Sequence, residues 1–272
     1  MTITPATPAT LTLKSHHKIR IKKLTIRYDM LCLITAGTKH VFTNETQSSQ
    51  YGTGSLLMFQ QGRIVDIINE PLPSTPYQAI VLCLTTDYIK QFEQRQQSVL
   101  ADMPILATYQ QQPTAQIPLN QQLKETFFRA VNSIEAYQQD PHSLNPVIYH
   151  HRLDELLLML ASLGYQFQPK HALSISDKIF RVVGHQLHKQ WSKTTIANAL
   201  HISTSTLERR LKAENTSFRQ LLLCFRMEQA MSLLLQGNLS VGEVAVACGY
   251  LSASRFSQAF QQYFSMLPSA VR

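Results

Sequence analysis

Two sets of side chains near the carboxyl end of the chain have the chemistry needed to bind bases and phosphates. The first set is Ser203, Ser205, Thr206, Glu208, Arg209 and Lys212, and the second is Ala253, Ser254, Arg255, Gln258 and Gln261. Most of them offer hydroxyl, amide or guanidinium groups that can bond to base edges, and the cations can pair with phosphates. A helix would gather each set on one outward side, because residues three or four positions apart are neighbours there. Both sets are therefore candidate contacts to double-stranded DNA.

The residues around the first set predict a helix, a tight turn and a second helix within residues 192–214. Ser192 and Ser203 are suited to begin the two helices, because a serine oxygen in that position accepts a hydrogen bond from a free backbone N–H. The positions expected to face inward are Ile196, Ala197, Leu200, Leu207 and Leu211. This is the plan of a helix-turn-helix, which places its second helix in the major groove of DNA.

The second set lies in a stretch of the same design, residues 240–264. Ser240 and Glu243 form a capping box, and Ser252 is suited to cap the following helix. Gly249 supplies the turn, where a positive φ is expected. The inward positions are Val241, Val244, Ala245, Cys248, Phe256, Phe260 and Phe264. One such copy could equally be an ordinary helical hairpin of an all-α domain, but two copies with one polar face each favour DNA binding.

The segment between the two copies predicts a single long helix. Residues 217–236 contain no Pro or Gly and are rich in apolar side chains. A helix of that length measures about 30 Å, and successive major grooves on one side of DNA lie about 34 Å apart. Such a helix could hold two reading helices over adjacent grooves.

These motifs resemble a known family. The matching runs are Leu207-x-Arg209-x-Leu211-Lys212, Phe218 with Arg226-Met227-x-x-Ala230, Cys248-Gly249-Tyr250-x-Ser252-x-Ser254-x-Phe256-Ser257, and Phe260-x-x-Tyr263-Phe264-x-x-x-Pro268-Ser269-x-x-Arg272. In them, residues 177–272 resemble the DNA-binding domain of AraC/XylS-family transcription regulators. The resemblance implies a regulator that binds promoter DNA as an activator or a repressor, with activation favoured. It also implies a place in the bacterial cytoplasm at the nucleoid and RNA polymerase as a partner.

Three positions depart from the pattern of that family. Gln258 stands where the family usually has Arg, Ser265 replaces the usual Gly, and Leu211 replaces the commoner Phe. The first departure could alter the base that is read, because an amide and a guanidinium prefer different bases. The other two should be structural.

The positive charge of the chain is concentrated in the same part of the sequence. Residues 1–168 contain 13 Lys and Arg against 12 Asp and Glu, a net charge of +1, whereas residues 169–272 contain 12 against 5, a net charge of +7. A basic domain is typical of a surface that binds phosphates.

Other classes of protein find little support in the sequence. No apolar run reaches about 18 residues, so we expect no transmembrane helix and no membrane contact. The four cysteines lack Cys-x-x-Cys spacing and fit free thiols in a reducing cytoplasm. The histidine pairs lack further ligands at metal spacing, and neither Gly-x-Ser-x-Gly nor a phosphate-binding loop with Lys occurs. We therefore expect no metal, no cofactor and no catalytic residue. The alternative is a small-molecule-binding protein or an enzyme whose C-terminal helices only pack.

The first part of the chain predicts a small β-barrel or jelly roll of the cupin-like kind, with helices. Its short β-rich runs are Ile19–Tyr28, Met30–Thr35, His40–Thr43, Ser55–Gln60, Arg63–Ile68 and Gln78–Leu84. Helices are expected at 86–99, 120–138 and 144–164, with a Gln/Pro-rich loop at 108–118. The fold class is therefore α+β, with an all-α C-terminal domain. The expected parts are a flexible tail (1–13), an effector-sensing or dimerisation domain (14–168), a linker (169–176) and a DNA-binding domain (177–272).

A run of cations without an acid suggests a site for a small carboxylate effector in the first domain. The candidate ligand-binding residues are Lys18, Arg20, Lys22 and Arg27, of which the first three can share one face of a strand. The alternative is an exposed strand edge protected by Lys and Arg.

The resemblance to the AraC/XylS family also suggests what kind of effector the first domain could bind. In its enteric virulence-regulator branch, which the chain resembles in its compact barrel, basic side chains hold a fatty acid between the domains. An ungapped alignment places Met30 and Leu235 at those positions, and neither is basic. Arg27 or Lys22 would have to substitute for them.

Residues 144–164 contain more apolar side chains than one buried stripe needs: Leu153, Leu156, Leu157, Leu158, Met159, Leu160 and Leu163. A helix that is apolar on more than one face is either deeply buried or covered by a partner. A second copy of the chain could cover the extra face and make a homodimer. The alternative is a helix enclosed within a monomer.

Overall fold

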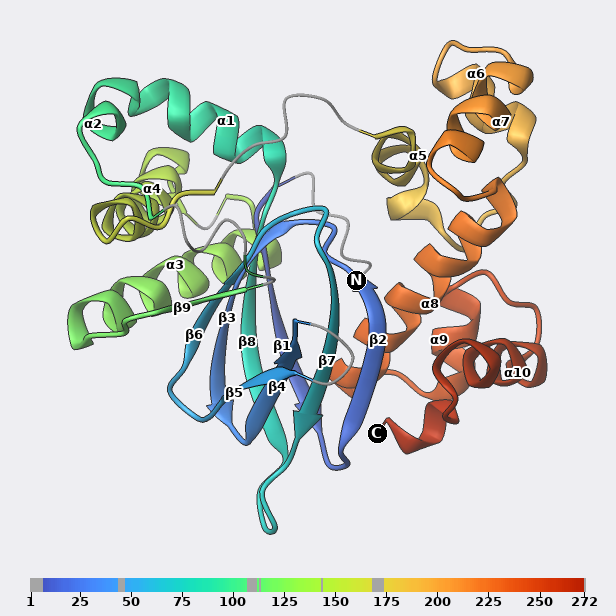
Figure 1. Ribbon diagram of the computed structural model, residues 1–272, viewed down its shortest axis with the longest axis horizontal. Coiled ribbons are helices and arrows are strands. Elements are labelled where there is room, and N and C mark those ends of the chain that lie inside the picture. Colours follow the sequence, from blue (N-terminus) through green and yellow to red (C-terminus); the bar gives the residue numbers. More distant parts are fainter. Residues whose placement is uncertain are drawn as a thin grey trace. The chain divides into compact units, whose positions relative to one another are not determined.

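The computed structural model describes residues 7–43, 47–106, 112, 114–142, 144–167 and 174–271, and the side chain of His185 is not described. The chain forms two compact units, Ala6–Pro169 and Lys170–Arg272. The first contains two antiparallel β-sheets and helices, and the described residues of the second form helices only (Figure 1). The expected α+β fold class, a small antiparallel β-barrel with helices and then an all-α part, is confirmed.

The barrel consists of nine strands within the described residues: β1 (Ala9–Ser15), β2 (Ile19–Thr25), β3 (Asp29–Ala36), β4 (Thr38–Phe42), β5 (Ser48–Tyr51), β6 (Leu56–Phe59), β7 (Ile64–Glu70), β8 (Tyr77–Leu84) and β9 (Ala115–Ile117). One sheet has the order β1-β8-β3-β6-β9 and the other the order β2-β7-β4-β5. The six predicted strands correspond to β2, β3, β4, β6, β7 and β8.

Three strands were missed, and one of them corrects the predicted tail. Residues 9–13 belong to β1, which pairs with β8 from Ala9↔Cys83 to Ser15↔Tyr77. Its Thr-Leu alternation fits a strand, but the flanking Pro and Ala residues suggested a flexible tail instead. β5 is a polar edge strand, and β9 lies inside the expected 108–118 loop. Residues 108–111 and 113 of that loop, and residues 1–6 of the tail, lie outside the described part of the chain.

Strand β3 of the larger sheet contributes side chains to two cores, because successive side chains point to opposite faces. Leu31 and Leu33 of β3 belong to an apolar cluster shared with the helices of the first unit. Cys32 and Ile34 of the same strand are equally buried and point the other way, between the two sheets. For this reason the sequence of β3 is a nearly continuous run of apolar residues.

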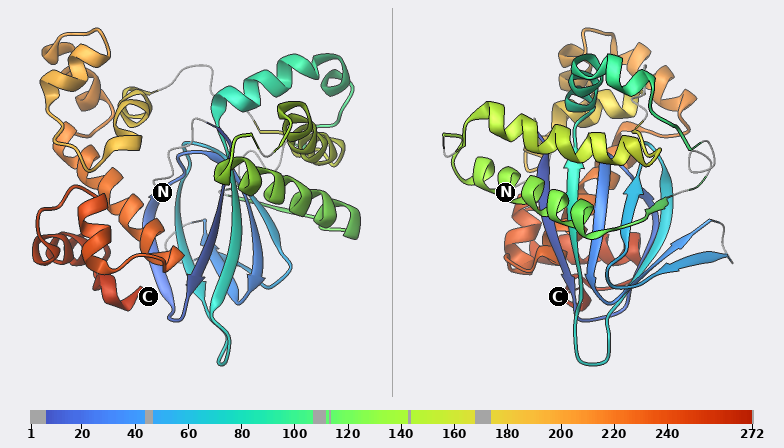
Figure 2. Two further views of the ribbon diagram at one scale, coloured as in Figure 1. Left: turned by 180° about the vertical axis from the view of Figure 1, so that it is seen from behind. Right: turned by 90° about the vertical axis from the view of Figure 1, so that its left-hand side faces the viewer.

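The described residues of the first unit also form four α-helices: α1 (Thr86–Arg95), α2 (Gln97–Ala101), α3 (Gln121–Gln139) and α4 (Pro146–Ser162). The expected helix at 86–99 is thus two helices, which Gln96 separates. α3 and α4 begin at Asn caps, Asn120 and Asn145, and run side by side (Figure 2). Asp154 of α4 accepts hydrogen bonds from Arg95 and from the Tyr88 hydroxyl at 2.8 and 2.9 Å, which ties α4 to α1.

Most of the extra apolar surface of α4 is covered within its own unit. Leu158 and Met159 are partly buried and pack against the same apolar cluster. Val147 and Ile148, in the first turn, remain 71% and 44% exposed. This packing agrees with the enclosed-helix alternative for the middle of α4. The start of the helix remains open to a partner, as does Leu163 at its end, which is 36% exposed.

The barrel contains a buried lysine, Lys39, that the sequence did not predict. Lys39 is only 3% exposed, and its ammonium donates to Asn69 Oδ1 at 2.6 Å and lies 5.3 Å from the ring centre of Tyr77. Asn69 Nδ2 is buried without a partner among the described residues. Burial lowers the pKa of Lys39, and the same burial raises the pKa of the neighbouring Cys32 thiol. All four cysteines are free thiols, as expected.

We predict that Lys39 makes stability depend on pH. Because its pKa is lower in the folded chain than the ordinary 10.5, the unfolded chain binds more protons in the window below 10.5. The free energy of unfolding should therefore rise with pH in that window, relative to Lys39→Met, which has no proton to lose. Urea unfolding at several alkaline pH values measures the difference. Lys14→Met, at an exposed position of β1, is the matched control and should run parallel to the wild type. Parallel curves for Lys39→Met as well would contradict the prediction.

The second unit contains α5 (Ile175–Val183), η2 (Gly184–Gln186), α6 (Lys193–Ala199), α7 (Thr204–Ala213), α8 (Phe218–Gln236), α9 (Val241–Ala247), α10 (Ala253–Phe264) and η3 (Pro268–Ala270). The predicted linker, 169–176, is too long at its end, because α5 already begins at Ile175 behind the Ser174 cap. Glu214, after α7, accepts from the backbone N–H of Ile175 and of Ser176 at 2.6 and 3.2 Å. This contact fixes the start of α5 on the end of α7. Residues 168–173 lie outside the described part of the chain.

Candidate nucleic-acid interface

The first helix-turn-helix forms as its caps predict. Ser192 and Ser203 each accept a hydrogen bond from the backbone N–H three residues on, and they begin α6 and α7. The turn between the helices is closed by Ile202, whose N–H donates to Ala197 O at 3.0 Å. Leu207 and Leu211 of α7 are buried in the apolar cluster of this half. The opposite side of α7 is therefore left to solvent.

The predicted DNA-contacting side chains of α7 differ in whether they already have a bonding partner within the protein. Ser203 caps the helix and also donates to Thr206 Oγ1 at 2.9 Å, so its first role is structural. Glu208 pairs with Lys193 of α6, which partly neutralises both side chains. Arg209 is exposed and has no hydrogen-bond or ion-pair partner within the described residues. Its guanidinium is therefore free to bind another molecule. Ser205 and Lys212 are exposed as well.

The second helix-turn-helix has the same construction. Ser240 and Glu243 form the predicted capping box at the start of α9, with bonds of 3.2 and 2.7 Å, and Ser252 caps α10. Phe256 and Phe260 of α10 are buried. The exposed polar or small positions on the outer side of α10 are Ala253, Ser254, Arg255, Gln258 and Gln261. All of the second predicted set is therefore exposed on α10.

Ser265, which stands where the family usually has Gly, lies at the strained C-terminal end of α10. Ser265 follows α10 with φ 58°, in the left-handed region, and its N–H donates to Gln261 O at 2.8 Å. Glycine adopts that conformation without steric cost, and other residues do not. The serine therefore keeps the same chain reversal at an energetic cost.

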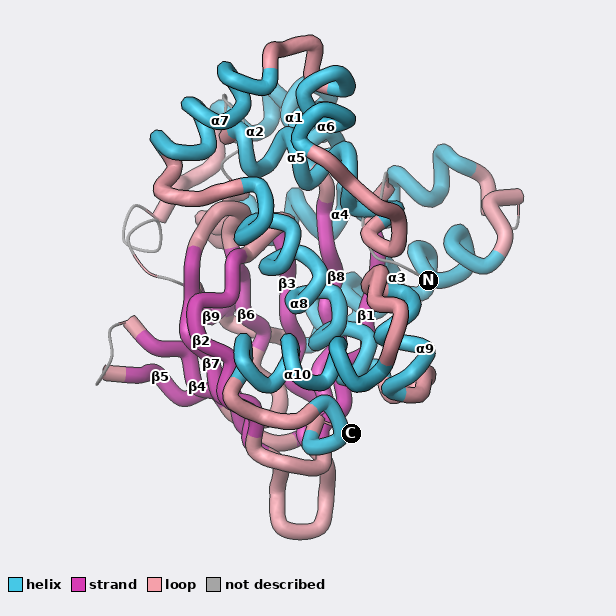
Figure 3. Tube along the Cα trace, turned by 90° about the vertical axis from the view of Figure 1, so that its right-hand side faces the viewer, coloured by secondary structure: helices cyan, strands magenta, loops and turns pink. Residues whose placement is uncertain are grey.

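The helix that joins the two copies has the predicted place and length. α8 begins at the Ser217 cap, and Gly237, with φ 74°, ends it (Figure 3). Its 19 residues measure about 28 Å at 1.5 Å per residue. The Tyr263 hydroxyl of α10 donates to Cys224 Sγ of α8 at 3.3 Å, which anchors the second reading helix on this scaffold.

A contact far apart in sequence fixes the second turn. Gly249 has φ 80°, as the sequence predicted, and a Cβ there would lie 2.6 Å from Leu187 O and 2.8 Å from Arg226 Nη2. Arg226 of α8 donates to Leu187 O and Lys189 O at 3.2 and 3.1 Å, and its guanidinium lies 6.0 Å from the ring centre of Tyr250. The turn of the second copy thus packs on the segment that leads into the first. This packing sets the two reading helices relative to each other.

The candidate effector residues lie mainly on the outside of β2. Arg20 and Lys22 are exposed, and the Lys18 ammonium pairs with Glu70 at 2.8 Å. Arg27 is half-buried. The arrangement resembles the alternative of an exposed strand protected by cations. The assignment of these residues to a ligand stays a prediction.

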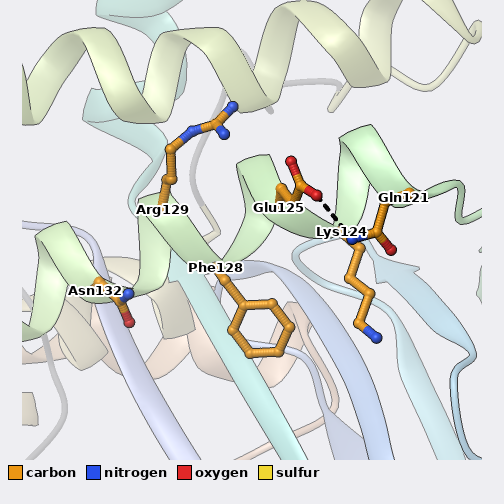
Figure 4. Close-up of a pocket in the computed structure, with 6 residues that line it drawn as sticks. All are labelled: Gln121, Lys124, Glu125, Phe128, Arg129 and Asn132. Atoms are coloured by element: carbon orange, nitrogen blue, oxygen red, sulfur yellow. Dashed lines mark hydrogen bonds between the residues drawn. The ribbon is translucent and has the colours of Figure 1, made fainter.

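The described part of the chain offers little else that resembles a site. A hollow of about 320 Å³ lies on the outer side of α3, lined by Gln121, Lys124, Glu125, Phe128, Arg129 and Asn132. It is open, and Gln121 donates to Glu125 at 2.7 Å (Figure 4). Arg129 donates to Glu155 of α4 at 2.8 Å. None of the helices described has the length and hydropathy needed to cross a membrane. No group of three metal-binding side chains occurs in the same residues.

A barrel followed by two helix-turn-helix copies on one long helix defines the class of AraC-type regulators. The model of a helix-turn-helix domain matches residues 196–272, and that of the ExsA N-terminal regulatory domain matches residues 29–168, slightly more than half of the chain. The chain therefore belongs to the AraC/XylS family of transcription regulators.

Curated relatives support this membership. The chain is 33% identical over 94 residues to the transcriptional regulator AdiY of Escherichia coli (strain K12), covering 35% of this chain and 37% of AdiY. It is 37% identical over 130 residues to YdeO of Shigella flexneri, covering 45% of this chain and 51% of YdeO. The chain thus spans about half of these relatives or less. Both are named as regulators of transcription, which supports a protein that is not an enzyme.

Solved structures share the fold of the whole chain. An apo variant of ToxT from Vibrio cholerae strain SCE256 has a TM-score of 0.67 at 15% identity and covers 97% of this chain and 96% of that one. Wild-type ToxT with a bound unsaturated fatty acid has a TM-score of 0.62 at 15% identity, with coverage of 99% and 96%. At this level of identity the likeness concerns the fold alone.

Proposed function

We propose that this protein is a sequence-specific DNA-binding transcription regulator that acts as an activator. α7 and α10 enter adjacent major grooves near a promoter, and α8 sets their spacing. The observation that carries the proposal is the pair of capped helix-turn-helix copies, each with an exposed polar face, joined through the contact of Gly249 with Leu187. Activation requires contact with RNA polymerase, and promoter binding places the protein at the nucleoid in the bacterial cytoplasm.

Arg209→Ala is expected to weaken binding to the selected DNA site by about 1–3 kcal/mol and to relax the base preference in one half of that site. The reason is that a guanidinium can form two hydrogen bonds with guanine, which the methyl group of alanine cannot replace. Gln258→Ala should have the equivalent effect in the other half, with adenine as the favoured partner. Fluorescence anisotropy and footprinting on sites selected from genomic DNA measure both effects.

The matched control for this experiment is Lys178→Ala, at an exposed position of α5 outside the two helix-turn-helix copies. It removes one positive charge and should leave the base preference unchanged. If Arg209→Ala changes neither affinity nor footprint, α7 does not face DNA as proposed. Absence of sequence-selective binding by the wild-type chain would overturn the function itself.

The proposal includes control by a small carboxylate bound to the N-terminal unit. Support comes from ToxT, the protein of the same fold, whose structures contain an unsaturated fatty acid in one case and a substituted butenoic acid in another. The candidate residues remain Lys18, Arg20, Lys22 and Arg27. Calorimetric titration of the full chain with an unsaturated fatty acid tests the idea, and a lack of heat at micromolar protein would count against it.

A homodimer formed through the start of α4 is a further part of the proposal. The exposed Val147 and Ile148 support it, because adjacent large apolar side chains gain from coverage by a partner. Sedimentation of the full chain with Val147→Asp should then show a monomer where the wild type shows a dimer. Ile64→Asp, at a 67% exposed apolar position of β7, is the control. A monomeric wild type at micromolar concentration would remove this interface.

A further inference from the structure

The two helix-turn-helix copies differ by one residue in their turns. Four residues separate α6 from α7, and five separate α9 from α10. The turns start alike, because the Ile202 N–H donates to Ala197 O and the Tyr250 N–H donates to Ala245 O, at 3.0 and 2.9 Å. In the first copy the cap, Ser203, follows at once. In the second copy one extra residue, Leu251, stands between Tyr250 and the cap.

Leu251 cannot fold back to bury its side chain. The Tyr250 ring packs on Phe256 with 5.5 Å between ring centres, and Ser252 accepts from the Arg255 N–H at 3.3 Å. The residues on both sides of Leu251 are therefore anchored. Its side chain is 93% exposed, more than any other large apolar residue in the described part of the chain.

The place of this leucine matters more than its exposure, since single exposed leucines are ordinary on protein surfaces. Leu251 stands directly before the cap of α10, next to Ala253 and Ser254. In a helix-turn-helix, the N-terminal residues of the second helix are those that meet base edges. Leu251 therefore projects from the end of α10 that faces the major groove.

The leucine side chain has no hydrogen-bonding group, so in the major groove it can recognise only an apolar group on a base. In the major groove, the apolar feature that distinguishes one base from the others is the 5-methyl group of thymine. We infer that Leu251 is a specificity-determining residue that contacts a thymine methyl group at the edge of the half-site read by α10. The inference rests on the proposed function and adds a base preference to it.

Replacement of thymine by deoxyuridine tests this contact, because it removes only the methyl group. The full chain is first used to select a high-affinity duplex from a random pool, and each thymine is then replaced in turn. One position should weaken binding about three- to fivefold, as expected for the loss of one buried methyl contact. With Leu251→Ala the same replacement should have no effect, and the all-thymine duplex should bind about five- to tenfold more weakly than to the wild type. Val246→Ala, at a 66% exposed apolar position of α9, is the matched control and should keep the uracil effect.

Three outcomes would overturn the assignment. If no thymine is sensitive to uracil, α10 reads no methyl group. If the sensitivity persists in Leu251→Ala, another side chain such as Ala253 makes the contact. If Leu251→Ala binds DNA normally but loses activation in transcription with purified polymerase, the leucine contacts a protein. In each of these cases the wild type still binds a selected duplex, so the proposed function stands. Failure to select any duplex would instead remove the function.

Discussion

Gly249→Ala is expected to destabilise the second unit by about 3 kcal/mol and to abolish tight binding to a two-part DNA site. Two costs add up. A residue with a side chain pays about 1–2 kcal/mol for the left-handed conformation, and overpacking adds about 1–3 kcal/mol. The overpacking arises because the new Cβ would lie 2.6 Å from Leu187 O, a backbone atom, and 2.8 Å from Arg226. The turn must then shift, and α10 moves relative to α7.

The chain contains a matched control for this substitution. Gly237, at the end of α8, has a similar φ of +74°, but nothing lies within 4 Å of a Cβ built there. Gly237→Ala should therefore pay only the conformational cost of about 1–2 kcal/mol and keep DNA binding. Urea unfolding and anisotropy at a temperature where both variants are folded compare the two. Equal effects for the two glycines would show that the contact with Leu187 is not needed.

DNA affinity should fall about five-hundredfold when monovalent salt rises from about 50 to 200 mM. Five exposed cations on or beside the two helix-turn-helix copies, which have no ion pair within the described residues, carry this expectation: Arg209, Arg210, Lys212, Arg219 and Arg255. Each cation that neutralises a phosphate adds about −0.9 to the slope of log affinity against log salt, so five give a slope near −4.5. Titrations at four or more salt concentrations measure that slope.

Charge-removing variants separate the contributions to the slope. Arg210→Gln should make the slope shallower by about 1, whereas Lys124→Gln, at an exposed position of α3 in the other unit, should not change it. Glu208→Gln should make the slope steeper, because it frees Lys193 from its ion pair. A slope near zero for the wild type would argue against phosphate contacts altogether.

The sequence determined the local structure of the second unit. The serine caps, the Ser240–Glu243 capping box, the positive φ at Gly249 and the extent of α8 were all predicted from nearby residues. Such features depend on hydrogen bonds and packing within one or two helical turns, and the residues that make them are adjacent in sequence. For the same reason the sequence indicated the outward side of α7 and of α10.

Only the tertiary structure decided features that join residues far apart. β1 is a strand because it pairs with β8, and Lys39 is buried because β4 places it opposite Asn69, between the two sheets. No local pattern predicted the burial of Lys39, since an isolated lysine in a strand is usually exposed. The contact of Gly249 with Leu187 and the projection of Leu251 likewise depend on how α8, α9 and the segment before α6 pack. Contacts of this kind form between side chains and backbone brought together by folding, and no local pattern of residues encodes them.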